Sequence, residues 1–155
     1  MGLFDWKKVG QATAEPESAD ALAATEEGQG AMVGGLNFMS AIDYHMRWKA
    51  RLESYIQGNS MEDLRVDVVC RDNECPLGQW IYGPGGERFS HFDTFGEMKA
   101  QHATFHACAG KVLSVARLGR KEDALRMLQQ GDYVRASERV KMLLAKLYVQ
   151  IVEKQ

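Results

Sequence analysis

The chain has 155 residues, of which 45% are hydrophobic and 26% are charged, and these values are normal for one soluble globular domain. With 19 Lys and Arg against 21 Asp and Glu the net charge is −2, which argues against a dedicated nucleic-acid-binding protein. No apolar run approaches the ~20 residues that a membrane helix needs, and no secretory signal is visible at the N-terminus. We therefore expect neither a nucleic-acid partner nor an integral membrane segment.

Residues 1–35 are predicted to be a flexible N-terminal tail. The stretch from about residue 10 to residue 35 is rich in Ala, Gly, Glu, Ser and Gln and offers little that could pack. Ahead of it lies a small apolar cluster of Leu3, Phe4 and Trp6. This cluster is expected either to fold back weakly or to serve as a short docking motif for a partner or a membrane surface. Residues 36–155 are predicted to be the folded domain.

Apolar residues at helical spacing predict three long amphipathic helices in this domain. They span about residues 36–57, 90–118 and 132–152, and Gly58 and Gly119 are expected to end the first two. Short helices are expected at about 76–80 and 121–130, and the sequence Tyr-Gly-Pro-Gly-Gly at 82–86 is predicted to be a loop. The pattern predicts an all-α fold, an antiparallel helical bundle with about four main helices and additional short ones.

Three of the four histidines, His45, His102 and His106, lie on the apolar stripes of these helices. One histidine in such a place is usually a core residue satisfied by hydrogen bonds, but three buried imidazoles without partners would each cost roughly a few kcal/mol. His102 and His106 are four residues apart, which offers two nitrogens to one metal ion from one helix face. His45 could approach from another helix, so a buried metal site is expected.

The three cysteines do not pair evenly, which favours a reducing cytoplasm and metal or redox chemistry over a disulfide framework. Cys75 stands at the predicted start of a short helix, where the helix dipole favours the thiolate, and it is the preferred fourth ligand. Cys70 is the rival, since it could replace Cys75 or join it in a site with two cysteines and two histidines. Cys108 lies inside a predicted helix and is expected to be inert packing. Sulfur together with imidazole favours zinc among the common metals.

Three motifs of the chain resemble the chemoreceptor zinc-binding (CZB) family in order and spacing. They are His-x-x-Trp at 45–48, Cys-x-Leu-Gly-x-Trp at 75–80 and His-x-x-x-His at 102–106, and the resemblance extends from about residue 37 to the C-terminus. It implies a zinc-binding helical bundle, commonly dimeric, of the kind found in bacterial chemoreceptors and diguanylate cyclases. It also implies zinc ligands at His45, Cys75, His102 and His106, with Trp48 and Trp80 packed behind them.

The resemblance implies a sensory or regulatory domain of bacterial signalling, in chemotaxis or cyclic-di-GMP control, and not an enzyme. Its signal would be zinc or the oxidation of Cys75, the redox-sensitive ligand. Because no catalytic or signalling domain is attached in this sequence, we expect it to act in trans on a signalling partner. Apolar residues outside the main stripe of the last helix, Met142, Val149 and Val152, favour a homodimer.

Two other functions stay open on the residues alone. A zinc-dependent hydrolase would need an open metal position for water, but the sequence has no HExxH motif and no Glu beside the histidine pair. A di-iron bundle of the hemerythrin type would need more imidazoles, and carboxylates at helical spacing from them. The positions four after His45, His91 and His106 hold Lys49, Phe95 and Gly110 instead. His91, the fourth histidine, is expected to cap the long helix or to lie on the surface.

Overall fold

A computed structural model describes residues 32–154, and its first element is a small hairpin that the sequence did not predict. Strand β1 (Met32–Val33) pairs antiparallel with β2 (Leu36–Asn37), with Val33 opposite Leu36. Gly34 and Gly35 form the turn with φ angles of 59° and 85°, which glycine adopts without steric cost. The hairpin therefore includes residues 32–35, which the sequence pattern predicts to be the end of the flexible tail. The rest of that predicted tail, residues 1–31, lies outside the described residues.

Helices form the remainder of the described fold. In chain order they are α4 (Phe38–Met46), α5 (Trp48–Ile56), α6 (Val66–Val69), α7 (Pro76–Ile81), α8 (Pro84–Phe89), α9 (Asp93–Arg117), α10 (Lys121–Gln129) and α11 (Asp132–Lys154). α4 and α5 together cover the residues that were predicted to form the first long helix. Backbone hydrogen bonds from Arg47 to Asp43 (3.0 Å) and from Arg51 to Arg47 (3.1 Å) continue the helical pattern across the break between them.

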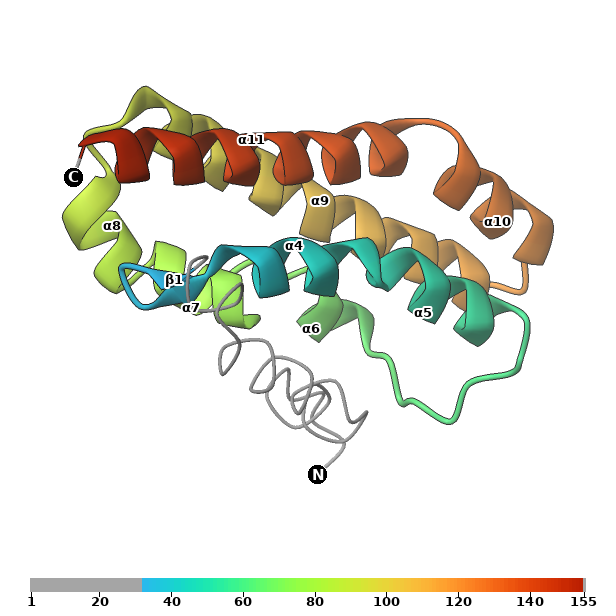
Figure 1. The fold of residues 1–155 in the computed structure, drawn as a ribbon. Helices are drawn as coiled ribbons and strands as arrows, with labels where there is room; N and C mark the ends of the chain where they lie inside the picture. The colour runs from blue at the N-terminus through green and yellow to red at the C-terminus, as the bar shows by residue number, and fades with distance from the viewer. Residues whose placement is uncertain (1–31, 155) are drawn as a thin grey trace.

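The long helices lie side by side, with α4–α5 and α9 running in one direction and α11 in the other (Figure 1). α11 runs antiparallel to α9 and to α4–α5 and packs against α9 and α4, while α6 packs on α9 and α10 connects α9 with α11. The apolar stripe predicted for the last helix is buried throughout, and its members are Tyr133, Val140, Leu143, Leu144, Leu147 and Ile151. The prediction of an all-α antiparallel bundle is therefore confirmed.

The prediction of a loop at residues 82–86 is wrong, because α8 begins at Pro84. Proline suits this first helical position because it has no backbone N–H that would need a partner. The two glycines that follow lack Cβ atoms, which would clash with α7 at these positions. A Cβ atom on Gly85 would lie 2.5 Å from the Trp80 ring, and one on Gly86 would lie 2.5 Å from the carbonyl oxygen of Ile81. These glycines allow α8 to approach α7 closely.

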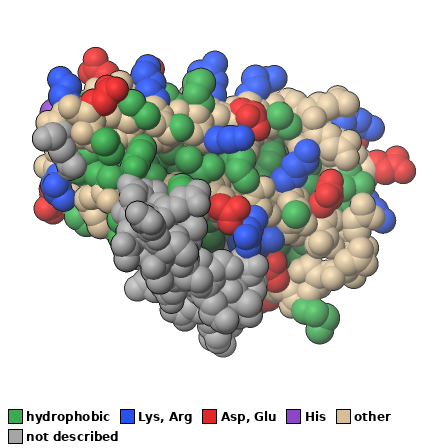
Figure 2. Space-filling view, in the orientation of Figure 1, with side chains coloured by type: hydrophobic (Ala, Val, Ile, Leu, Met, Phe, Trp, Pro, Cys, Tyr) green, Lys and Arg blue, Asp and Glu red, His purple; other side chains and the backbone are tan. Residues whose placement is uncertain are grey.

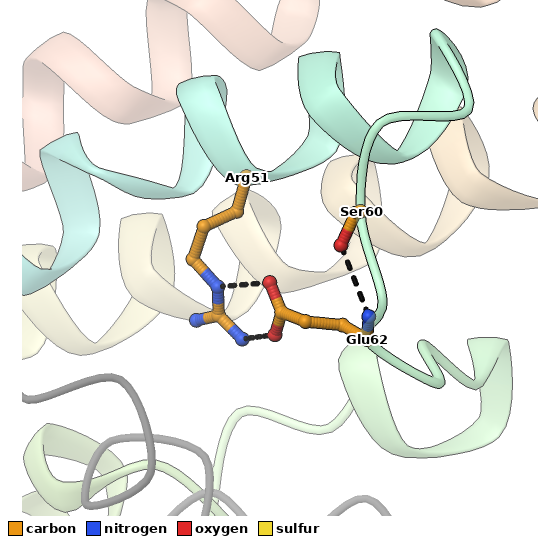
Figure 3. Close-up of polar contacts among 3 residues, drawn as sticks. All are labelled: Arg51, Ser60 and Glu62. Atoms are coloured by element: carbon orange, nitrogen blue, oxygen red, sulfur yellow. Dashed lines mark hydrogen bonds and ion pairs between the residues drawn. The ribbon is translucent and has the colours of Figure 1, made fainter.

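The segment between α5 and α6 is held to α5 by one ion pair (Figure 3). The guanidinium of Arg51 donates to both carboxylate oxygens of Glu62, at 3.2 Å from Nε and 2.5 Å from a terminal nitrogen, and it also lies over the Trp48 ring. The backbone N–H of Glu62 donates to the Ser60 hydroxyl at 3.1 Å. Since both charged side chains are less than one quarter exposed, this pair fixes the segment more firmly than a surface pair would.

None of the helices within residues 32–154 combines the length and the apolar character that crossing a membrane requires.

Candidate metal centre

Four buried side chains meet at the centre of the bundle, and they come from two helices and the N-cap of a third. They are His45 on α4, Cys75 at the N-cap of α7, and His102 and His106 on α9. Each side chain offers one donor atom, and these atoms all lie within 4.8 Å of one another. All four residues are at most 1% exposed. The structure thus brings together the residues that the sequence motifs selected.

The separations between the donor atoms suit a tetrahedral zinc ion. The Nε2 atom of His102 lies 3.1 Å from the Nε2 atoms of both His45 and His106, and the Cys75 sulfur lies 3.3 Å from His102 and 3.6 Å from His45. Zinc–nitrogen and zinc–sulfur bonds of about 2.0 and 2.3 Å in a tetrahedron place two nitrogens about 3.3 Å apart and a nitrogen and a sulfur about 3.5 Å apart. These four distances differ from the tetrahedral values by a few tenths of an ångström, and the separations of His106 from His45 and Cys75 are at most 4.8 Å.

Backbone carbonyl groups orient two of the imidazoles toward the centre. The Nδ1–H of His45 donates to Ala41 O at 2.7 Å, and the Nδ1–H of His106 donates to Val69 O at 3.0 Å. Each of these rings therefore directs an Nε2 lone pair at His102 Nε2, which carries at most one proton. His102 Nδ1 has no hydrogen-bond partner among the described residues. A cation between the nitrogens would satisfy lone pairs that the protein alone leaves facing one another, so this donor set fits a metal ion.

The position of Cys75 follows from the start of α7. Its side chain caps the helix and accepts a hydrogen bond from the Gly78 N–H at 3.3 Å, while Pro76 occupies the first helical position. Gly78 lies against the preceding turn, because a Cβ atom there would be 1.9 Å from the carbonyl oxygen of Asp72. Leu77 is buried beside it. The Cys-x-Leu-Gly sequence therefore combines a sulfur donor, a buried anchor and a glycine required for space.

Burial keeps the four donors neutral in the absence of a cation. It lowers the pKa of His45 to about 3, with a further contribution from His106, and lowers the pKa of His106 to about 4. Burial also holds the pKa of His102 well below its ordinary value and raises the pKa of the Cys75 thiol to about 12. The imidazoles are thus in the metal-binding form at neutral pH, whereas the thiol must lose a proton when it binds a metal.

Both tryptophans of the motifs are buried. Trp48, three residues after His45, is fully buried and lies under the Arg51 guanidinium. Trp80 packs against Phe38, Phe89 and Phe95, and its Nε1–H donates to Gly34 O at 2.7 Å. Trp80 therefore ties the helix that carries Cys75 to the β-hairpin.

The remaining candidate residues lie apart from this group. Cys70 is exposed, and its Cβ atom lies against Gly110 of α9. Cys108 is partly buried in α9, and burial raises the pKa of its thiol. His91 is exposed just before α9, which begins at Asp93. Sequence reasoning missed the carbonyl groups of Ala41 and Val69, for which no side-chain pattern gives a signal.

Residues 45–113 match the family model of the chemoreceptor zinc-binding domain. This segment is similar to a CZB domain. The matched region begins at His45 and includes all four donors, so the resemblance found from the motifs is confirmed and zinc is the cofactor of this domain. The CZB family is a family of regulatory, sensory domains rather than of enzymes. Searches of curated proteins and of solved structures found no match to the chain.

Proposed function

We propose that the CZB domain is a sensor whose zinc ion is bound by His45, Cys75, His102 and His106, and whose output changes when Cys75 leaves the metal. The observation that carries this proposal is the convergence of four buried donors at zinc-like separations. Zinc supplies a positive charge that fixes the thiolate and three imidazoles in one arrangement. Trp48 and Trp80, both buried, are proposed to support the ligands from behind.

The four ligands would connect α4, α7 and α9 in addition to the contacts of Trp80 with Phe38 and Phe95. α9 contributes two donors, whereas α4 and α7 contribute one each. When all four bind the metal, the binding free energy stabilises the contact between α4, α7 and α9. α7 is the element most dependent on this link, because it has only six residues and Cys75 is its single donor. The short α7 is therefore the movable part of the sensor.

Cys75 is also the residue through which an oxidant would act. Attack of the thiolate on hydrogen peroxide would form an S–O bond and break the O–O bond, which gives sulfenic acid and a hydroxide ion. The oxidised sulfur is a poorer ligand, so α7 would be released while three histidines retain a weaker hold on the metal. Removal of zinc would release α7 by the same route. Both signals would thus produce one structural change.

A surface for the output lies on α11. Met142, Ala145, Val149 and Val152 are all exposed and follow the 3-4-3 spacing of a helix-pairing stripe. Figure 2 shows hydrophobic side chains gathered in a band between α11 and α4. We propose that the α11 face formed by these four exposed residues pairs with a second copy of the chain. A signalling protein would then bind the dimer in trans and respond to its state. Three free cysteines are consistent with a cytoplasmic location.

The geometry favours this sensor over the two alternative functions. Four buried donors leave no coordination position facing solvent or a substrate, which a zinc hydrolase would need. The group contains three imidazoles and no carboxylate, whereas di-iron bundles use carboxylates from facing helices. Neither alternative has a feature within residues 32–154 that favours it.

A cysteine series tests the ligand set. The Cys75→Ser variant is expected to lose about 100-fold or more in zinc affinity, because the one anionic ligand is removed. Cys70→Ser and Cys108→Ser are the matched controls, and both should retain wild-type affinity. Affinity is measured by competition with a chromogenic chelator. Equal zinc retention in all three variants would contradict the assignment of Cys75.

X-ray absorption at the zinc edge provides a direct test of the complete shell. The expected spectrum has one sulfur neighbour at about 2.3 Å and three nitrogen neighbours at about 2.0 Å. After peroxide treatment the sulfur contribution should disappear. Absence of the sulfur neighbour, or a fifth light-atom neighbour, in the untreated protein would instead support an open, hydrolytic site.

A further inference from the structure

A cavity of about 350 Å³ lies between the β-hairpin, α4 and α7. Leu36, Ala41 and Leu77 give it apolar walls, one from each of these elements, and Tyr44 and Trp80 add two aromatic rings. A cavity of about 150 Å³ with an apolar lining can hold one benzene ring, and ligand pockets in proteins begin at about 300 Å³. This cavity therefore has room for a flat molecule of about two rings, which would pack favourably against the aromatic walls.

The lining of the cavity favours an uncharged molecule. None of the lining residues, which all lie between residues 32 and 80, is Asp, Glu, Lys or Arg. The imidazole among them, that of His45, is neutral at physiological pH, because burial lowers its pKa to about 3. An ion would lose its hydration in this cavity without gaining a counter-charge, so a charged ligand would bind poorly.

One hydroxyl group at the cavity is left without a partner. Ser40 lines the cavity from α4, and its hydroxyl oxygen is buried with no hydrogen-bond partner among the described residues. A buried hydroxyl group in this state is unfavourable, so a ligand that forms a hydrogen bond with it gains affinity. Ser40 lies one helical turn before Tyr44, which places the hydroxyl and one aromatic wall on the same face of α4. These features point to a ligand with one hydrogen-bonding group on an apolar ring system.

The position of the cavity connects its occupancy with the metal centre. His45, the donor from α4, and Leu77, two residues after the donor Cys75, both line it. A molecule that contacts both would hold the start of α7 against α4, which is the arrangement that places the Cys75 sulfur 3.6 Å from His45. Two ligands that favour one arrangement of the protein strengthen each other's binding by the same factor.

We propose that this cavity binds an uncharged, flat aromatic molecule with one hydrogen-bonding group, and that its occupancy strengthens zinc binding. The hydrogen-bonding group pairs with the Ser40 hydroxyl, and the rings lie among Ala41, Leu77 and Trp80. Binding in the cavity does not require the metal, whereas the effect on zinc affinity rests on the proposed ligand set.

Calorimetric titration of the full chain with 2-naphthol tests the cavity. We expect a Kd of about 0.1 mM or tighter for the metal-free protein, with nuclear Overhauser cross-peaks from the probe to the methyl groups of Leu36, Ala41 and Leu77. The charged analogue naphthalene-2-sulfonate should not bind. Failure of 2-naphthol to bind, or equal binding of the sulfonate, would overturn the proposal. Binding that weakens as the protein is concentrated would assign the cavity to a second copy and would also overturn it.

Two substitutions of Ser40 locate the probe. Ser40→Leu fills part of the cavity and should abolish 2-naphthol binding. Ser40→Ala should lower the affinity for 2-naphthol about three- to tenfold and leave the affinity for naphthalene unchanged, because only the hydrogen bond is lost. Ser114→Leu is the control, since Ser114 is exposed on α9 and its replacement should not affect binding. Wild-type 2-naphthol binding in both Ser40 variants would place the probe elsewhere and overturn the assignment.

Chelator competition with and without saturating 2-naphthol measures the connection to the metal. Zinc affinity should rise about threefold or more when the probe is bound, and probe affinity should rise by the same factor when zinc is loaded. Unchanged affinities would overturn the coupling. The Cys75→Ser variant separates the two proposals, because the probe should still bind to it. If 2-naphthol binds but zinc does not bind to the wild type, the cavity assignment stands and the ligand assignment fails.

Discussion

Gly78 is the residue at which the position of Cys75 depends most directly on backbone space. A Cβ atom there would lie 1.9 Å from the Asp72 carbonyl oxygen, so Gly78→Ala forces the start of α7 away from the preceding turn. We expect the variant to lose about 2–3 kcal/mol of unfolding free energy and about tenfold in zinc affinity. Denaturant unfolding and chelator competition measure the two effects.

Gly96 on α9 is the matched control for this substitution. Nothing lies within 4 Å of a Cβ atom built at this exposed helical position. Gly96→Ala should therefore stabilise the protein by about 0.5–1 kcal/mol, because alanine loses less backbone entropy in a helix. If the two alanine variants behaved alike, the spatial role assigned to Gly78 would be wrong.

The three buried imidazoles predict that the metal-free protein is sensitive to mild acid. Their pKa values are lowered in the folded state, to about 3 for His45 and about 4 for His106, whereas an unfolded histidine titrates near 6.5. The unfolded chain therefore binds more protons below pH 6.5, and the stability present above that pH is lost as the pH falls. Each histidine contributes about 1.4 kcal/mol per pH unit, or about 4 kcal/mol for all three between pH 7.5 and pH 5.5.

Urea unfolding of the metal-free protein at several pH values measures this loss. The variant His91→Gln is the control, because it removes the one exposed histidine and should leave the slope unchanged. A flat stability profile between pH 7.5 and pH 5.5 would show that the imidazoles are not buried as neutral groups.

At the scale of single residues, sequence predicted the donor side chains but not what orients them. His45, His102 and His106 could be selected because polar residues on apolar stripes are unusual, and the His-x-x-x-His spacing brings two of them together. The choice of Cys75 over Cys70 rested on its helix-start context and on the motif. The carbonyl groups of Ala41 and Val69 could not be predicted, since every residue carries a carbonyl and only the fold selects the ones that meet an imidazole.

Among the elements, the segment between α5 and α6 depends on the ion pair of Arg51 with Glu62. Glu62→Gln removes the charge and one strong acceptor and leaves the partly buried guanidinium without its carboxylate. We expect a loss of about 1 kcal/mol in unfolding free energy, with zinc affinity unchanged. Thermal or urea unfolding of the zinc-loaded and metal-free forms measures it.

The exposed pair of Arg47 with Asp43 is the comparison for this prediction. Its side chains are 42% and 57% exposed, so solvent screens the interaction. Asp43→Asn should change stability by at most about 0.5 kcal/mol. A loss from Asp43→Asn as large as that from Glu62→Gln would remove the special role given to the α5–α6 pair.

The elements could be predicted wherever a long apolar stripe was present. The apolar stripes of α9 and α11 predicted both helices, with ends that lie within a few residues of those in the structure. α8 was predicted as a loop because Pro84, Gly85 and Gly86 are typical of turns. Their actual role, close approach to α7, depends on the position of Trp80 and Ile81 and is not visible in the local sequence. The two-residue strands of the hairpin are too short to produce an alternating pattern.

At the scale of the whole molecule, the outer face of α11 predicts dimerisation. Met142→Glu and Val149→Glu place charges within the exposed stripe and should convert a dimer into a monomer of 17.4 kDa. Met61→Glu is the control, because Met61 is fully exposed outside this face. Light scattering coupled to size-exclusion chromatography measures the mass. A monomeric wild type, or a dimer that survives both α11 substitutions, would contradict the assigned face.

The hydrogen bond from His106 to the Val69 carbonyl has a consequence for the seven residues 69–75. This segment is held at Val69 by a hydrogen bond from one nitrogen of the His106 imidazole. Its other end, Cys75, would be held by the metal ion that the second nitrogen of the same ring would bind. Because the imidazole ring is rigid, both ends of the segment would be positioned by one residue, His106. Loss of the contact between the Cys75 sulfur and the metal would therefore release the Cys75 end while Val69 stays bound to His106, and the displacement of the segment would be transmitted to the start of α7.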